Sequence, residues 1–296
     1  MKYSYLAYGL IIHSDLPLPE LVSCEGMADM VIRLDKLDPS RLETTSEGID
    51  FRVTNEGVFL FWKNEGIFLI RDGKEIIIDP FPGVDERVLR LIILGPALAT
   101  ALHQRGRLAL HAATVEIDGK AVGFMGGPGC GKSALAATLY KRGHKIVADD
   151  VTAVQPDGAD GPLVIPGFPQ LKLWPEVIAA LGDEPERLPY LEPGTEKRSF
   201  RITSSFSEKP LLLGQIYLLN EDHSKEIVPL PPQEALLELV RHSYRACLLR
   251  WIGAERHLSQ CASIVNALPI SRLNRPLSLS MLPEIARMVE DNLANV

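Results

Sequence analysis

Short apolar runs separated by turn residues occupy the first 80 positions of the chain. The runs contain β-branched and aromatic residues, and Asn, Asp or Gly lie between the later ones, which is typical of strands joined by tight turns. They cover residues 6–12, 30–34, 58–62, 67–70 and 76–78. This pattern predicts an antiparallel sheet, and no group of catalytic side chains is visible in it.

A helical pattern follows over residues 85–104, where apolar residues recur at helical spacing. Pro96 is expected to kink or split this helix because proline has no backbone N–H to donate. Gly106 is expected to end it. We therefore expect a β-rich N-terminal domain over residues 1–105, with this helix as the link to a second domain over residues 106–296.

From residue 106 the pattern alternates between strands and helices. Strands at 108–113 and 121–125 are followed by a glycine-rich segment, a helix at 132–142 and a strand at 145–148. This order predicts an α/β domain with a βαβ-like nucleotide-binding core. Beyond it, the sequence predicts an irregular Pro- and Gly-rich loop over 156–193, a strand over 211–219, and helices over 232–249, 255–268 and 281–294.

Composition narrows the class of protein. Hydrophobic residues make up 46% and charged residues 23%, which excludes a disordered or fibrous chain. The formal charge of −7 argues against a nucleic-acid partner, which requires an excess of basic residues on the protein. No apolar run approaches the ~20 residues of a membrane-spanning helix. Four scattered cysteines and an opening without signal-peptide features make a cytoplasmic protein the expectation.

The strongest chemical signal is the segment 126–133, GGPGCGKS, which has the GxxxxGK[ST] pattern of a phosphate-binding loop. Glycine allows the backbone to aim several N–H groups at one phosphate, and the N-terminus of the following helix favours the same anion. Lys132 would reach the β and γ phosphates, and the Ser133 hydroxyl would hold Mg²⁺. The residues expected at the nucleotide are Gly126, Gly127, Pro128, Gly129, Cys130, Gly131, Lys132, Ser133 and Ala134.

Asp149 and Asp150 are the second candidate feature. They follow an apolar strand, where a carboxylate of a phosphate-loop protein coordinates magnesium. Two adjacent acids can divide the work, one holding the metal and one accepting a proton from an attacking hydroxyl. His111, in an otherwise apolar strand, is the third candidate, although such a histidine taken alone is more often a core residue.

Phosphoryl transfer also needs positive charge near the transferred group. Four cations lie on or near the proline-rich loop, namely Lys172, Lys197, Arg198 and Arg201. Lys197 and Arg198 are the candidates that we assign to the nucleotide, and an ordinary solvated charge cluster is the alternative.

The segment from His111 to Val151 resembles the catalytic domain of HPr kinase/phosphorylase, a bacterial serine kinase built on a phosphate loop. That family has a histidine in an LHG-like strand, the loop, an RGH turn and a VADD strand, and this chain has LHAATVEIDGKAVGFMGGPGCGKS followed by LYKRGHKIVADDV. The resemblance implies a P-loop kinase domain of the HPr kinase type with ATP at the loop. It also implies roles for individual residues: His111, Asp149 and Lys132 in catalysis, and Ser133 and Asp150 on Mg²⁺.

The rest of the chain departs from true HPr kinases. The β-rich N-terminal part does not resemble theirs, and the later GLGIINV-type signature is missing, which leaves phosphorolysis without support. The segments YLAYGLIIHSDLPLPEL, LHQRG and PGFPQLKLWPE are similar to HPr-kinase-related proteins, some of which phosphorylate a serine at the C-terminus of a lasso-peptide precursor. The resemblance implies a protein or peptide substrate that bears a serine, and it leaves a homo-oligomer open.

Two other functions stay open on the sequence. One is a P-loop ATPase or nucleotide switch without a hydroxyl acceptor, in which His111 would be dispensable. The other is a small-molecule kinase, with the loop over 156–193 as its lid.

Overall fold

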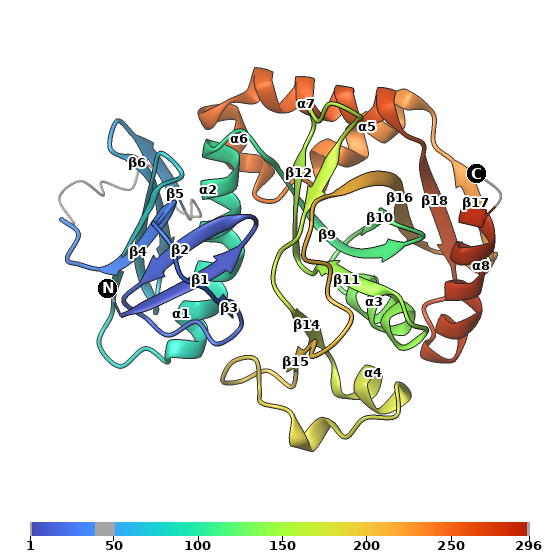
Figure 1. Cartoon of the computed structure of the whole chain (residues 1–296), viewed down its shortest axis with the longest axis horizontal. Helices are drawn as coiled ribbons and strands as arrows, with labels where there is room; N and C mark the ends of the chain where they lie inside the picture. The colour runs from blue at the N-terminus through green and yellow to red at the C-terminus, as the bar shows by residue number, and fades with distance from the viewer. Residues whose placement is uncertain (1, 39–50, 295–296) are drawn as a thin grey trace.

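An eight-stranded sheet holds most of the first 80 residues (Figure 1). The computed structural model describes residues 2–38 and 51–294, and the order of the strands in this sheet is β3-β1-β2-β4-β8-β7-β6-β5. The strands are β1 (Tyr3–Ala7), β2 (Leu10–Ser14), β3 (Val22–Ser23), β4 (Met30–Leu34), β5 (Phe51–Thr54), β6 (Gly57–Trp62), β7 (Gly66–Arg71) and β8 (Glu75–Pro80). The strands predicted over 30–34, 58–62, 67–70 and 76–78 are confirmed. The single strand predicted over 6–12 is instead two strands, β1 and β2, joined by a turn at residues 8–9.

The expectation of a purely antiparallel sheet was wrong. Strand β4 pairs in parallel with both of its neighbours, β2 and β8. Neither parallel pair is joined by a tight turn: β3 lies between β2 and β4 in the chain, and β5, β6 and β7 lie between β4 and β8. Parallel pairing needs such a crossover connection, whereas the tight turns seen in the sequence join only antiparallel neighbours.

The linking helix is split as the sequence predicts. It consists of α1 (Glu86–Ile92), a π-helical turn (Ile93–Ala97) and α2 (Leu98–Gln104), and Pro96 lies inside the π-helical turn. Helix α2 lies between the two parts of the molecule, in contact with β7 on one side and with β9 and β12 on the other (Figure 1).

A second sheet forms the centre of the remaining chain. Its order is β10-β9-β12-β13-β16-β18-β17, with β11 paired to β9 and β10 also paired to β16. The strands are β9 (Leu108–Ile117), β10 (Lys120–Met125), β11 (Lys145–Ala148), β12 (Val151–Gln155), β13 (Leu163–Ile165), β16 (Leu211–Glu221), β17 (Glu226–Pro229) and β18 (Ile270–Arg275). The unit β10–α3–β11, with α3 at Lys132–Lys141, runs as expected, but β9 lies between the two strands and is antiparallel to both.

Helices cover both faces of this sheet. Side chains of α3 and of α8 (Leu282–Ala294) pack in one apolar cluster, and side chains of α5 (Pro232–Arg241) and α7 (Ala254–Ala267) pack in another (Figure 1). Alternate residues of β9 enter the two clusters, as the period of a strand requires. Among residues 2–38 and 51–294, no helix is both long and apolar enough to cross a membrane.

Two expectations about the later part of the chain were wrong. The proline-rich segment 156–193 is not irregular throughout, because it contains β13, β14 (Gln170–Leu173) and α4 (Pro175–Ala180), and β14 pairs with β15 (Arg198–Arg201). The single helix expected over 232–249 is instead two helices, α5 and α6 (Ala246–Ile252). The break falls at residues 242–245, where Ser243 bridges to Leu110 of β9 and Arg245 adopts a left-handed backbone with φ 51°.

The N-terminal sheet and the second part of the molecule share one apolar core. Tyr8 and Ala97 belong to the same buried cluster as Ala109, Val151 and Phe168. This packing places the N-terminal sheet and the π-helical turn directly behind the strand that follows Asp149 and Asp150.

Candidate active site

The phosphate loop (residues 126–133) joins the end of β10 to the start of α3. Gly126, Gly129 and Gly131 have φ of 149°, 78° and 84°, a region that side chains other than glycine rarely adopt. A Cβ at Gly127 or Gly129 would meet no atom of the described residues within 4 Å, so this side of the loop is open. Gly131 caps α3 without a side chain, which leaves the first N–H groups of the helix facing an incoming anion.

Lys132 holds the loop closed on itself. Its Nζ donates hydrogen bonds to the main-chain oxygens of Gly126 at 2.8 Å and of Gly127 at 3.1 Å. The side chain is buried, and the ammonium therefore lies at the base of the cradle, where the terminal phosphates of a nucleotide are held in phosphate-loop proteins.

Ser133 and Asp149 are in direct contact. The Ser133 hydroxyl donates to Asp149 Oδ1 at 2.7 Å, and the main-chain N–H of Lys172 donates to Asp149 Oδ2 at 2.9 Å. Asp149 is buried, and burial raises the pKa of this carboxyl above its usual range. The raised pKa is consistent with a group that exchanges a proton nearer to neutral pH.

Asp150 is held in an unusual backbone conformation. Its φ is 70°, and the N–H of Val151 bonds to the oxygen of Asp149 across it at 2.9 Å, which turns the Asp150 side chain away from that of Asp149. Lys172 Nζ lies 2.6 Å from Asp150 Oδ2, and His111 Nε2 lies 3.5 Å from Asp150 Oδ1. Burial works to raise the pKa of Asp150, but the charge and hydrogen bond of Lys172, together with His111 and Lys132, outweigh it and hold this pKa below its usual range.

His111 lies in β9 with its ring toward the same acids. Its ring centroid is 5.6 Å from that of Tyr244, and the main-chain N–H of His111 donates to the main-chain oxygen of His242 at 2.7 Å. Burial, together with the charge of Lys132, lowers the pKa of His111 to about 4. The imidazole is therefore neutral near pH 7.

These side chains line one cavity of about 610 Å³ over the phosphate loop. The predicted residues found on its wall are His111, Pro128, Gly129, Gly131, Lys132, Ser133, Ala134, Asp149, Asp150 and Lys197. Gly126, Gly127 and Cys130 belong to the loop without lining the cavity. Lys197 reaches the wall beside Trp174, with its Nζ 5.2 Å from the ring centroid.

Arg198 does not lie where the sequence analysis placed it. It is buried, its guanidinium lies 3.5 Å from the ring centroid of Tyr190, and it donates to the main-chain oxygens of Pro185 and Glu196. Arg198 is the first residue of β15, whereas its neighbour Lys197 precedes the strand. Arg198 therefore holds the loop over residues 181–197 together instead of facing the phosphates.

Two positively charged side chains of the site, those of Lys172 and Arg275, could not be assigned to it from the sequence. Lys172 was one of four cations noted on the proline-rich loop, and nothing in its spacing singled it out as the partner of Asp150. Arg275, at the end of β18, lines the cavity and donates to the main-chain oxygen of Cys130 in the phosphate loop. Only the tertiary structure brings it there, because 145 positions separate Arg275 from Cys130.

The donor atoms suit magnesium. Hydroxyl and carboxylate oxygens are the ligands that this cation prefers, and it binds through one or two carboxylates together with substrate phosphates. Ser133, Asp149 and Asp150 supply such oxygens on the wall of one cavity. Within the described residues, no cluster of three or more His, Cys, Asp or Glu side chains could form an all-protein metal site.

Comparison with known proteins gives short but clear similarities. The chain is 46% identical over 56 residues to an HPr kinase/phosphorylase of Exiguobacterium sibiricum, which covers 19% of this chain and 18% of that protein. It is 45% identical over 58 residues to one of Xanthomonas campestris pv. campestris (19% and 18%), and 39% identical over 49 residues to one of Lachnoclostridium phytofermentans (17% and 16%). The matched segment thus spans less than a fifth of each of these relatives.

No family model matches the chain. Among solved structures, the HPr(Ser) kinase/phosphatase of Coxiella burnetii aligns with a TM-score of 0.33 and 13% identity, over 63% of this chain and 97% of that one. The predicted resemblance is confirmed at the level of sequence, because this mixed α/β chain is similar to HPr kinase/phosphorylases over a segment of about 50 to 60 residues.

Proposed function

We propose that this chain is an ATP-dependent kinase that transfers the γ-phosphoryl group to a serine hydroxyl of a protein or peptide. One observation carries the proposal: an open glycine cradle, a buried lysine, two carboxylates and a neutral imidazole line the same cavity. Binding of a nucleotide requires only the cradle and the lysine. The carboxylates and the imidazole add a means of removing a proton from an acceptor.

In the proposed reaction, the phosphate loop and Lys132 hold the β and γ phosphates. The hydroxyl oxygen of the acceptor forms a bond to the γ phosphorus, and the bond from that phosphorus to the bridging oxygen of ADP breaks with its electron pair. The hydroxyl proton passes to Asp149, with His111 as a second acceptor. When bound, Mg²⁺ neutralises negative charge on the β and γ phosphates.

Two features bear on how Asp149 and Asp150 divide the work. The raised pKa of Asp149 favours it as the proton acceptor, whereas its hydrogen bond from Ser133 places it beside the expected metal ligand. We assign the proton to Asp149 and the metal to Asp150 and Ser133. The Ser133 hydroxyl can rotate from Asp149 toward a bound cation, so its hydrogen bond does not commit Asp149 to the metal. The burial that raises the pKa of Asp149, in contrast, is fixed by the fold.

The acceptor is proposed from the relatives. Their name states that they act on HPr, and the proteins that share the N-terminal segments noted above suggest the C-terminal serine of a lasso-peptide precursor instead. Both acceptors present a serine hydroxyl on a polypeptide, so the proposed reaction is the same for either.

The experiment is a transfer assay with the purified chain, γ-labelled ATP, Mg²⁺ and a synthetic peptide library in which every peptide contains one serine. We expect labelled phosphoserine with the wild-type chain and a loss of about 10²- to 10⁴-fold in His111→Ala or Asp149→Asn, as expected for the removal of a proton acceptor. Lys132→Ala should also lose nucleotide binding.

The nucleotide-switch alternative gives the opposite result. If the chain binds and hydrolyses ATP, labels no peptide, and keeps its hydrolysis rate in His111→Ala, the kinase proposal is wrong. Labelling of small alcohols but of no peptide would favour a small-molecule kinase.

A further inference from the structure

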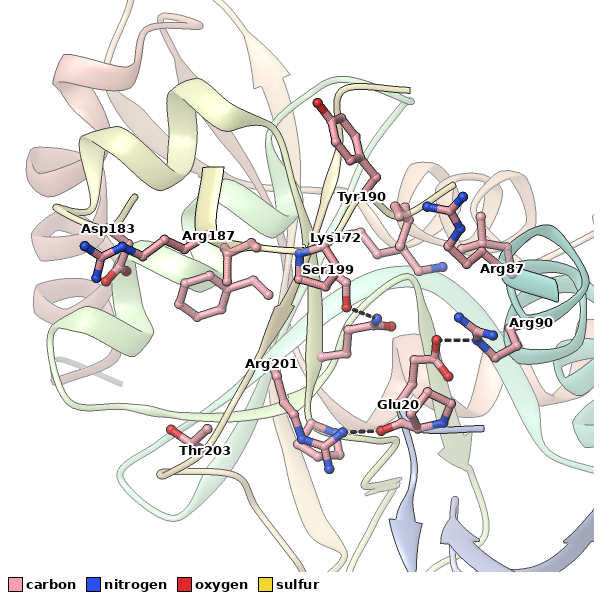
Figure 2. Close-up of a pocket in the computed structure, with 18 of the residues that line it drawn as sticks. Glu20, Arg87, Arg90, Lys172, Asp183, Arg187, Tyr190, Ser199, Arg201 and Thr203 are labelled. Carbon is pink, nitrogen blue, oxygen red and sulfur yellow. Dashed lines mark hydrogen bonds and ion pairs between the residues drawn. The ribbon is translucent and has the colours of Figure 1, made fainter. Parts of the chain in front are cut away.

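A second cavity, of about 780 Å³, lies between the N-terminal part of the molecule and the loop over residues 181–197 (Figure 2). Pro19, Glu20, Arg87 and Arg90 line it from the N-terminal part of the molecule, and Arg187 and Arg201 line it from the second part. Its volume is within the ~300–1,000 Å³ of pockets that hold drug-sized molecules, which is far more than one serine side chain requires.

The second cavity adjoins the first. Leu91, Lys172 and Leu191 line both of them, and Lys172 is the residue whose ammonium pairs with Asp150. A bound polypeptide that lies in the second cavity can therefore extend past Lys172 to the carboxylates of the first cavity. No part of the phosphate loop borders the second cavity, so a nucleotide bound at the loop leaves it free.

The charge of the second cavity is opposite to that of the whole protein. Five cationic side chains and three carboxylates line it, whereas the chain as a whole has 31 basic and 38 acidic residues. The three carboxylates are already paired: Glu20 with Arg90 at 2.9 Å, Asp183 with Lys141 at 2.7 Å and Glu184 with Arg187 at 2.7 Å.

Arg201 differs from the other cations. It is exposed, and its guanidinium donates to the main-chain oxygen of Pro19, a neutral group, across the cavity (Figure 2). Within residues 2–38 and 51–294, Arg201 takes part in no ion pair. A guanidinium can bind a carboxylate with two parallel hydrogen bonds, so this side chain has capacity for an acidic group.

Apolar surface accompanies this charge. Leu91, Leu188 and Leu191 are half-buried on the wall, and Tyr190 is 47% exposed. A short polypeptide presents both kinds of group, apolar side chains for the wall and a carboxylate for Arg201.

Resting on the proposed kinase function, we propose that the second cavity binds the acceptor polypeptide beside its serine, and that it selects a segment with apolar residues and at least one acidic side chain. Arg201 would pair with the acidic side chain, and the serine would lie past Lys172 at the carboxylates of the first cavity. The N-terminal part of the molecule would then supply half of the acceptor site.

The test is an array of synthetic peptides, each with one serine and randomised residues on both sides, that is read in two ways. Binding of the labelled chain is measured in one copy of the array and transfer from γ-labelled ATP in another. The variants are Arg201→Glu, Thr203→Trp to fill the second cavity from its exposed edge, and Arg287→Glu on α8 as a matched control.

The wild-type chain should prefer peptides with Asp or Glu near the serine. Arg201→Glu should lower binding and transfer for those peptides by about tenfold, the equivalent of losing one charged hydrogen-bonded contact. This variant should instead prefer peptides with Lys or Arg near the serine. Thr203→Trp should weaken binding of all peptides, and Arg287→Glu should change neither measurement. Nucleotide binding and the melting temperature should stay the same in all three variants.

The two proposals fail in different ways. Transfer without a preference for acidic residues, or a preference that Arg201→Glu leaves unchanged, would overturn the acceptor site and leave the kinase in place. If acidic peptides bind through Arg201 and none is labelled, the kinase proposal is wrong and the second cavity is a peptide site of another kind. If inorganic phosphate displaces the bound peptides as well as unlabelled acidic peptide does, the cavity binds small anions and the acceptor inference is wrong.

Discussion

The phenol oxygen of Tyr8 donates a hydrogen bond to the main-chain oxygen of Val151 at 3.0 Å, across 143 positions of sequence. Val151 directly follows Asp149 and Asp150, and the Tyr8 ring packs edge-on against Phe168. The N-terminal sheet thus contacts the back of the turn that presents both acids, so a change in Tyr8 can reach the site without touching any group in it.

We expect Tyr8→Phe to lower the free energy of unfolding by about 1 to 3 kcal/mol, because the buried oxygen of Val151 loses its donor from the phenol. Phosphoryl transfer should lose kcat with little change in the KM for ATP, since Tyr8 touches no part of the phosphate loop. Tyr3→Phe, at a half-exposed ring on β1, is the control. Equal kcat in both variants would show that the contact does not position the acids.

The buried charge of Asp149 should cost stability. Because burial raises its pKa in the folded state, the folded chain holds this proton more tightly than the unfolded chain, and stability falls as pH rises through the raised value. Asp149→Asn should therefore raise the melting temperature at pH ~7.5, and this gain should vanish toward acid pH. The same variant should lose transfer activity. Melting curves across pH test the first expectation, and a variant less stable than the wild type at every pH would contradict it.

Asp150→Asn should have the opposite effect on stability. The folded-state pKa of Asp150 is lowered, so its contribution is present at neutral pH and is lost as pH falls through that value. The variant leaves the Lys172 ammonium buried without its carboxylate partner and should melt at a lower temperature than the wild type at pH ~7.5. It should also need more Mg²⁺ for half-maximal transfer. If Asp149→Asn instead shifts the Mg²⁺ requirement, the two acids have exchanged roles.

Gly95 leaves little room behind Asp150. A Cβ atom at this position would lie 3.0 Å from Tyr244 Oη and 3.8 Å from Asp150 Oδ2. We expect Gly95→Val to displace Tyr244 and reduce transfer at least tenfold while nucleotide binding persists, and Gly95→Ala to have a smaller effect. Full activity in Gly95→Val, measured in the same transfer assay, would show that the π-helical turn does not constrain the acid.

The buried His103 and the half-buried His111 should make the fold sensitive to acid. Burial lowers the pKa of His103 and of His111 to about 4 in each case. The unfolded chain takes up these protons first, so stability is complete above the ordinary value near 6.5 and is lost as pH falls toward 4. In denaturant titrations between pH ~6.5 and ~4.5, the free energy of unfolding of His103→Gln should fall less steeply with decreasing pH than that of the wild type. The exposed His223→Gln is the control, and an unchanged slope in His103→Gln would contradict the assignment.

The local chemistry of the site could be predicted from sequence because its parts are contiguous. Eight consecutive residues make the phosphate loop: its glycines act through the backbone, and Lys132 and Ser133 act through side chains at the start of the helix that follows. Asp149 and Asp150 follow a short apolar strand, and the motifs between His111 and Val151 were sufficient to indicate the resemblance to HPr kinase/phosphorylases. The helix break at Pro96 follows from the missing N–H of proline.

Other features were decided only by the tertiary structure, because they depend on pairings between distant segments. The strand pair β14–β15 directs Arg198 into the loop and away from the phosphates, and the place of β18 in the sheet carries Arg275 to the phosphate loop. The pairing of Lys172 with Asp150 separates the pKa values of two adjacent carboxyls that the sequence could not tell apart. The second cavity lies where Pro19, Glu20 and helix α1 face residues 182–191 and β15. These segments are far apart in the sequence and meet only in the folded chain, so the sequence pattern could not predict the cavity.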